Sequence, residues 1–308
     1  MSATSLWALM WCSLSSGAVD EDAVLSALAE REKIFKSISC RLQGRHWYER
    51  VDGGEPDAGW DGVVIVEMNG RIRQEGLRPL RGWPTQQVVQ VAADVMKMLS
   101  GPTGKEFGLI SAEGPLYECL IDPKELVGYF SERPISAYYR ETPAISRSVR
   151  REQSMYVLHL EEPKPEDDPE LNGRVSIWLD PEKGLAVRRI ERILSYDGRT
   201  WLPLLDLTFD DFTLDSRWNV WLPGKATRVM NYVWKDKPTK LCSRDEHVIT
   251  QWVVNPEIPP EAFTLSFPPG CMVENKMTGR VYHVGSLNDM LVNEQARLAL
   301  DMAAEEGR

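Results

Sequence analysis

The sequence predicts an α+β protein whose strands pair mainly in antiparallel order. The first observation is a change of period near the N-terminus. Residues 21–38 carry apolar side chains about every 3.6 residues, and residues 38–43 then alternate apolar with polar side chains. The second observation is a series of short apolar segments from residue 153 onward, separated by turn residues. Since parallel strands need long crossover connections, these short turns favour an antiparallel meander.

In the first half of the chain we expect helices that interrupt the strands. After the helix at 21–38 and the strand that follows it, residues 62–68 and 71–77 predict a hairpin, because Asn69 and Gly70 both tolerate positive φ at its turn. Residues 84–99 repeat Val and Met at helical spacing and begin with a proline, which predicts a helix. Two strands at 107–112 and 116–121 and a helix at 123–130 follow, and residues 131–151 form a connector without a clear assignment.

The second half of the chain predicts strands almost throughout. The expected strands are 155–160, 174–179, 185–194, 204–212, 218–222, 226–234 and 245–254. The turns between them are residues 180–184, 197–198 and 223–224, and residues 286–308 predict a peripheral helix. The strands at 226–234 and 245–254 are apolar on both faces, so both faces need a cover. Either helices cover one face and a semi-exposed aromatic face remains, or a ligand lies in a groove.

Charge and composition exclude some functions. The 308 residues carry a formal net charge of −10, which argues against nucleic-acid binding, because a phosphate backbone attracts positive surfaces. Residues 6–18 are uncharged and mostly apolar, so residues 1–18 predict an export signal, with a packed N-terminal tail as the alternative. The segment is too short to span a bilayer, and no later one is apolar enough, so we expect no transmembrane segment.

The cysteines and histidines give no metal or redox motif. No C-x-x-C pair occurs and the four histidines are scattered, so we expect neither a zinc site nor a thioredoxin-like site. With residues 1–18 removed, four cysteines remain, and disulfides and buried thiols stay equally open for them: Cys40, Cys119, Cys242 and Cys271.

A search for catalytic patterns finds little. The chain lacks a G-x-S-x-G elbow, a P-loop and a G-x-G-x-x-G loop. His46 with Tyr48, or His247 with Asp245, has the residue types of an acid/base pair, but a strand histidine beside apolar neighbours is more often only packed. We therefore expect no enzyme, no metal and no cofactor.

Two charged clusters have competing interpretations. Asp210, Asp211 and Asp215 offer ligands for a hard cation, but they lack EF-hand spacing and lie at a predicted strand end. Arg188, Arg189 and Arg192 form a basic stripe on one strand. Pairing with acidic side chains on neighbouring strands is the simpler interpretation of the stripe, and contact with an anionic headgroup is the alternative.

Four segments together carry a resemblance to a known family. Residues 24–48 predict a helix that runs into a strand, and residues 110–123 (ISAEGPLYECLIDP) predict a pair of strands. Residues 174–193 predict a strand, D-x-x-G, strand hairpin, and residues 255–273 (NPEIPPEAFTLSFPPGCMV) close the series. These segments resemble the opening helix and first strand, the S-D-G-x-x-L-W-x-Y-x-P strand pair, the hairpin and the closing segment of the outer-membrane lipoprotein carrier (LolA/LolB-like) family of periplasmic lipid-binding proteins. The closing segment is the most specific of the four.

The resemblance implies a strongly twisted antiparallel sheet that forms a half-barrel over residues 19–285. Helices would cover its concave face, with an apolar cavity between sheet and helices. An acyl chain gains about 0.8 kcal/mol for each CH₂ group removed from water, so such a cavity suits lipid. We predict an exported, non-enzymatic, monomeric protein of the periplasm or cell envelope that binds lipid or the acyl chains of lipoproteins. Lipoprotein carriage is one form of this activity.

The candidate cavity residues are chosen by strand alternation. They are Ile38, Leu42, Val64, Val66, Trp178, Ile190, Met230, Trp234 and Trp252. A shift of one residue in register would turn the whole set to the other face. The alternative function is an envelope sensor or protein-interaction module on the same fold, and a hydrolase has no supporting motif.

Overall fold

The structure is a computed structural model that describes residues 19–49, 54–92, 95–102, 105–112, 121–165, 168, 170–235 and 237–285. Its backbone contacts divide the chain into two compact units. Unit 1 comprises residues 1–35, 48–51 and 124–244, and unit 2 comprises residues 36–47, 52–123 and 245–308. The chain passes between the units several times, so neither unit is one continuous segment.

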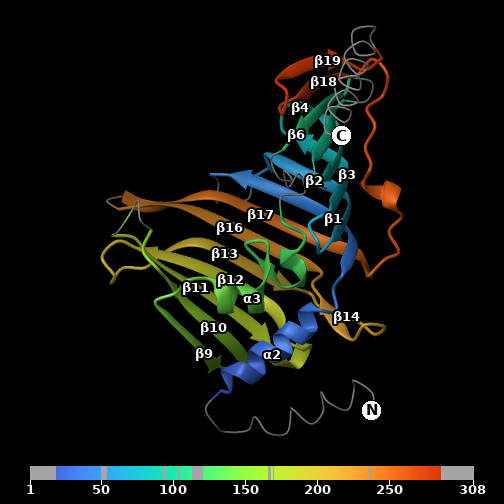
Figure 1. The fold of residues 1–308 in the computed structure, drawn as a ribbon. Helices are drawn as coiled ribbons and strands as arrows, with labels where there is room; N and C mark the ends of the chain where they lie inside the picture. Colours follow the sequence, from blue (N-terminus) through green and yellow to red (C-terminus); the bar gives the residue numbers. More distant parts are fainter. Residues whose placement is uncertain are drawn as a thin grey trace, which may run out of the picture. The chain divides into compact units, whose positions relative to one another are not determined.

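Unit 1 contains the predicted meander (Figure 1). Its strands hydrogen-bond in the order β9 (Ser146–Glu152), β10 (Met155–Glu162), β11 (Asn172–Asp180), β12 (Ala186–Ser195), β13 (Leu202–Asp210) and β16 (Lys225–Trp234). Each of these pairs is antiparallel, as the short turns predict. Between β13 and β16 the chain forms a small hairpin of β14 (Thr213–Asp215) and β15 (Val220–Leu222).

Two α-helices lie in the described part of unit 1. Helix α2 (Glu21–Glu32) begins at Asp20, whose carboxylate accepts a hydrogen bond from Ala23 N. It buries Val24, Leu25 and Leu28. Helix α3 (Ile135–Glu141) contacts α2 and follows a 3₁₀ turn, η1 (Glu125–Val127), and a short hairpin of β7 (Tyr129–Phe130) and β8 (Arg133–Pro134). A second 3₁₀ turn, η2 (Pro181–Lys183), joins β11 to β12.

Unit 2 is built from strands. In hydrogen-bonding order these are β1 (Ser37–Tyr48), β2 (Ala58–Glu67), β3 (Ile72–Leu80), β4 (Trp83–Ala92), β5 (Met96–Gly101), β6 (Phe107–Ser111), β18 (Met272–Asn275) and β19 (Arg280–His283). All of these pairs are antiparallel except the parallel pair β6/β18. The long strand β17 (Lys237–Val254) contributes its first residues to unit 1 and its last residues to unit 2, where the 3₁₀ turn η3 (Pro260–Phe263) follows it.

The predicted fold class, a half-barrel with helices covering its concave face, is wrong. Among the residues that the structure describes, fifteen strands follow one another in a single hydrogen-bonding order from β9 to β19, with both antiparallel and parallel pairs, and they form no closed barrel. The described residues contain two α-helices, of 12 and 7 residues. The helices predicted at 84–99 and 123–130 are absent from their positions. Strands β4 and β5 occupy the first, and η1 with β7 occupies the second.

The error at residues 84–99 has a physical reason. Strand β4 buries Val88, Val89 and Val91, so both of its faces are covered and the alternation that identifies a strand is hidden. β-branched residues fit a pleated surface better than a helix, and here they pair with β3 and β5. The same stretch therefore shows helical spacing by coincidence.

Other expectations are confirmed or lie outside the described residues. The strands predicted beyond residue 153 and the turn near Asn69-Gly70 are present, and Gly70 has φ +108°. The first helix ends at Glu32, earlier than residue 38. The export signal at 1–18, the helix at 286–308 and most of the strand at 116–121 lie outside the described residues. No helix of the described residues combines the length and apolarity needed to cross a membrane.

Candidate functional site

Four of the nine candidate cavity residues share one face of unit 2. Cys40 pairs with Val64, and Ile38 pairs with Val66, so the even-numbered residues of β1 and β2 face the same way. Ile38, Leu42, Val64 and Val66 are all buried, none more than 1% exposed. These four residues therefore lie in the core of unit 2, and their role as cavity residues stays a prediction.

In unit 1 the same reasoning fails at Trp178. Ile177 pairs with Ile190, while Trp178 pairs with Arg189. Because directly paired residues share a face, Trp178 and Ile190 lie on opposite faces of the sheet. Ile190 is fully buried, and the Trp178 ring lies 4.9 Å from the Arg189 guanidinium, which stacks on it.

The remaining three candidates are incompletely buried. Met230 and Trp252 are half-buried, and Trp234 is 38% exposed. The αL conformation of Gln251, with φ +53°, interrupts the alternation of β17 just before Trp252. None of the nine candidates lines either of the two pockets described next.

The larger pocket is an apolar groove of about 230 Å³ in unit 1. We call it the Leu171 groove. It lies where β10 ends, β11 begins and β12 ends. Its lining residues are Thr142, Pro143, Glu162, Pro163, Pro165, Leu171, Gly173, Arg192 and Leu194. Three prolines and two leucines give it rigid apolar walls, because proline has no side-chain rotamers to lose.

Charged side chains at the Leu171 groove are already paired. Arg192 Nε donates to Glu162 Oε2 at 2.9 Å, and the Tyr138 hydroxyl donates to Glu162 Oε1 at 3.4 Å. Burial, together with the negative charge of Glu162, raises the pKa of Tyr138. Gly173 leaves room for this arrangement, because a Cβ atom there would overlap Glu162 Oε2. The groove thus presents an apolar wall beside a neutralised polar group.

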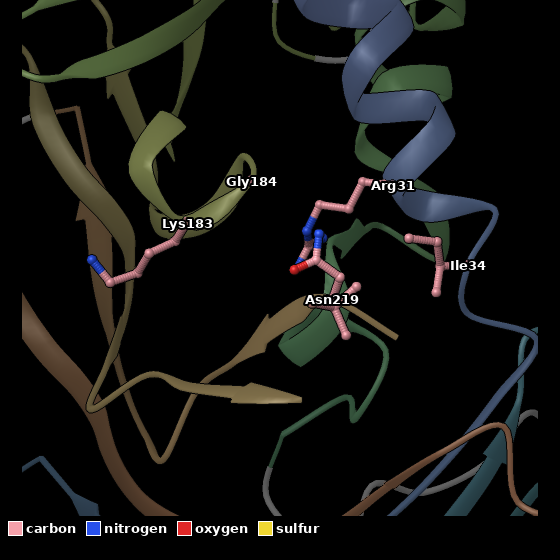
Figure 2. A pocket seen from close by; sticks show the side chains of 6 residues that line it. Arg31, Ile34, Lys183, Gly184 and Asn219 are labelled. Atoms are coloured by element: carbon pink, nitrogen blue, oxygen red, sulfur yellow. The ribbon is translucent and has the colours of Figure 1, made fainter. Parts of the chain in front are cut away.

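The smaller pocket has a buried arginine in its wall, and we call it the Arg31 pocket. Its volume is about 40 Å³, and it is lined by Arg31, Ile34, Lys183, Gly184, Asn219 and Val220. Figure 2 shows the Arg31 side chain directed toward Asn219, while the Lys183 ammonium points away from both. Lys183 Nζ instead pairs with Asp180 Oδ2 at 2.9 Å.

Arg31 is held by neutral partners. Its Nη1 donates to the Val127 carbonyl at 3.0 Å and its Nη2 to the Trp221 carbonyl at 3.5 Å, and the Phe35 ring lies 5.3 Å from its guanidinium carbon. The residue is 3% exposed, and burial lowers its pKa to about 10. Among the described residues, Arg31 Nε has no hydrogen-bond partner.

The adjacent Glu32 is buried as well, but its carboxylate bonds elsewhere. It accepts hydrogen bonds from Ser136 N at 2.9 Å and from the Ser136 hydroxyl, which ties α2 to α3. Burial raises its pKa. The sequence analysis singled out neither Arg31 nor Glu32. The signal that it missed is spacing, since Arg31 and Glu32 follow buried Leu28 by three and four residues and so share its face.

The other side chains considered for chemistry make pairs with neighbouring side chains. His46 Nδ1 and Asp245 Oδ1 lie 2.5 Å apart, so His46 pairs with Asp245, where the sequence analysis had paired His247 with it. The predicted neutralisation of the arginine stripe is confirmed, because Arg188, Arg189 and Arg192 pair with Asp210, Asp206 and Glu162. No cluster of three metal-binding side chains occurs in the part of the chain that the structure describes. Cys242 and Cys271 are free thiols, and Cys119 lies outside the described residues.

An aromatic cluster lies on the surface of unit 1. The Tyr48 and Tyr232 hydroxyls are 3.0 Å apart, and the Tyr232 and Trp234 rings stack with centroids 5.3 Å apart. Tyr48 is 51% and Trp234 is 38% exposed. Lys237 Nζ lies 5.8 Å from the Trp234 ring. Exposed aromatic rings beside a lysine are typical of surfaces that dock on another molecule.

Comparison with known proteins gives distant structural likeness alone. No protein-family model and no curated protein sequence matches the chain. A Vibrio parahaemolyticus domain described as an outer membrane lipoprotein-sorting protein domain is 12% identical, with TM-score 0.43, over 78% of this chain and 95% of that one. A DUF1329 family protein from Desulfovibrio piger is 9% identical, with TM-score 0.40, over 79% of this chain and 96% of that one. At these values the likeness carries no assignment of function.

Proposed function

We propose that the protein binds lipid, or the lipid-bearing part of a lipoprotein, and holds the end of an acyl chain in the Leu171 groove. The observation that carries this proposal is an apolar groove of about 230 Å³ whose charged residues are already paired. An apolar cavity of roughly 150 Å³ takes up benzene, so this volume suits a short apolar segment. Location in the cell envelope and carriage of lipoproteins are the finer parts of the same proposal.

The chemistry of the walls supports an apolar ligand. The side chains of Pro163, Pro165 and Leu171 have no hydrogen-bonding groups, and Arg192 forms an ion pair with Glu162. A polar ligand would lose hydration in the groove and find few partners to replace it, since Thr142 is the one uncharged polar side chain among the lining residues. An acyl end would bury CH₂ groups at a gain of about 0.8 kcal/mol each.

Photolabelling locates the ligand. Purified protein is irradiated with a fatty acid that carries a diazirine at its methyl end, and the labelled peptides are identified by mass spectrometry. We expect the label on peptides that contain Pro163, Leu171 or Leu194. Label spread over the exposed aromatic cluster, with none in the groove, would contradict the proposal.

A second candidate function is an interaction module, which the exposed aromatic cluster favours. Tyr and Trp are enriched at protein interfaces as well as at membrane interfaces, because one end of each ring is polar. Sedimentation with lipid vesicles separates the two functions. Retention on vesicles that Trp234→Ala abolishes would favour lipid contact, and no retention with either form would favour a protein partner.

A further inference from the structure

We propose that the Arg31 pocket binds a carboxylate group. This site is separate from the Leu171 groove. Gly184, beside the Arg31 pocket, precedes the first residue of β12, whereas Arg192 and Leu194 of the groove lie near its last. A strand rises about 3.3 Å per residue, so one small ligand cannot occupy both places.

The charge of Arg31 calls for an anion. Its partners in the described chain are the carbonyl oxygens of Val127 and Trp221, which carry only partial charge. The neighbouring Glu32 carboxylate attracts Arg31, but its oxygens bond to Ser136 and form no ion pair with the guanidinium among the described residues. Lys183, a cation paired with Asp180, supplies no counter-charge and points away in Figure 2. A buried charge without a counter-charge in direct contact is unfavourable, and an anion that enters the pocket offsets part of that desolvation cost.

The geometry of the guanidinium selects the type of anion. Nη1 is engaged at 3.0 Å, Nη2 only at 3.5 Å, and Nε has no partner among the described residues. Nε and Nη2 form one edge of the guanidinium, and two parallel N–H groups on one edge match the two oxygens of a carboxylate. The edge therefore offers bidentate recognition.

The size of the Arg31 pocket favours a small planar group. A volume of about 40 Å³ is room for roughly three water molecules, since each needs about 10–15 Å³. Asn219 is exposed and lines the same pocket, and Figure 2 shows its amide next to the Arg31 side chain. The arrangement suits a terminal carboxylate that enters past Asn219, with the rest of its molecule outside. A free organic acid and the C-terminus of a peptide share this chemistry.

Titration of the full chain with acetate tests the proposal. The readout is the side-chain Nε–Hε resonance of Arg31 in ¹⁵N NMR spectra, assigned by its loss in Arg31→Lys. Chloride replaces acetate to keep ionic strength constant, and acetamide serves as the uncharged analogue. We expect a saturable downfield shift with acetate and none with acetamide or chloride. A dipeptide with a free C-terminus, compared with its C-terminal amide, distinguishes the two sources of carboxylate.

A variant at the pocket mouth keeps the test independent of Arg31. Asn219 has φ +53°, so Asn219→Gly removes the amide without backbone strain, and Gln153→Gly, from φ +54° in another turn, is the matched control. We expect Asn219→Gly to weaken acetate binding by about threefold, because one neutral hydrogen bond is lost. The control should leave acetate binding unchanged. Equal responses to acetate and chloride, or an unshifted Nε–Hε resonance, would overturn the proposal.

Discussion

Replacing Gly62 by alanine tests the close approach of β2 and β3 in unit 2. Gly62 lies directly opposite Gly76. A Cβ atom at Gly62 would lie 2.6 Å from Gly76 Cα and 2.8 Å from the Trp60 ring. Backbone atoms cannot rotate away, so the strands must separate by roughly the 0.8 Å that divides 2.6 Å from an ordinary contact of 3.4 Å. Overpacking of this kind lowers the free energy of unfolding by about 1–3 kcal/mol. We expect about 3 kcal/mol, because separating the strands also lengthens the backbone hydrogen bonds between β2 and β3.

Urea unfolding, followed by circular dichroism and by tryptophan fluorescence, measures the loss. The matched control is Gly59→Ala on the same strand, where the nearest atoms to the new Cβ are Pro79 Cγ at 3.0 Å and Gly44 O at 3.2 Å. We expect the control to change the free energy of unfolding by less than about 1 kcal/mol. If Gly62→Ala unfolds at the wild-type urea concentration, the register of β2 against β3 described here is incorrect.

Three further predictions concern stability. Because burial raises the pKa of Glu32, the folded state favours its protonated form, so this group's contribution to stability is present at low pH and is lost as pH rises through the raised pKa. Glu32→Gln should flatten that part of the curve of unfolding free energy against pH, and an unchanged curve would contradict it. Leu28→Ala removes a fully buried side chain and should cost about 2–5 kcal/mol in urea unfolding, whereas a loss below about 1 kcal/mol would show that the site is not core. Glycine accepts the φ of +51° at Asn255, but Asn255→Gly removes the oxygen that accepts hydrogen bonds from Lys36 N and Ser37 N. The substitution should therefore lower the free energy of unfolding by about 1–3 kcal/mol. Thermal unfolding measures the loss, and an unchanged midpoint would contradict it.

The meander was predictable because its turns are local. Asp180 accepts from Glu182 N at 3.0 Å, and Gly184 has φ +59°, so the residues between β11 and β12 specify the turn by themselves. Strand positions in this half follow from such turns. The two-sided burial of β4, by contrast, depends on its neighbours, and the local pattern of Val88 and Val91 could not reveal it.

The candidate site was less predictable than the strand positions of the second half of the chain. Strand alternation found the buried face at Ile38 and Val64, but neither residue lines the Leu171 groove or the Arg31 pocket. The register between β11 and β12 decides that Trp178 faces away from Ile190, and register is a non-local property. The Leu171 groove joins segments separated by about fifty positions, so proline and leucine there gave no periodic signal. The helical spacing of three residues from Leu28 to Arg31 would have predicted that Arg31 lies on the buried face of the helix.

The proposal of lipid binding is tested most directly by titrating delipidated protein with a fluorescent fatty acid. Leu171→Glu places a carboxylate in the groove, and Leu214→Glu is the matched control, because Leu214 is 41% exposed on β14 and does not line the groove. We predict saturation at one probe per chain, and binding at least about tenfold weaker in Leu171→Glu, since a desolvated charge costs more than about 1.4 kcal/mol. The control should bind like the wild type. No saturation, or equal binding by both variants, would contradict a ligand in the Leu171 groove.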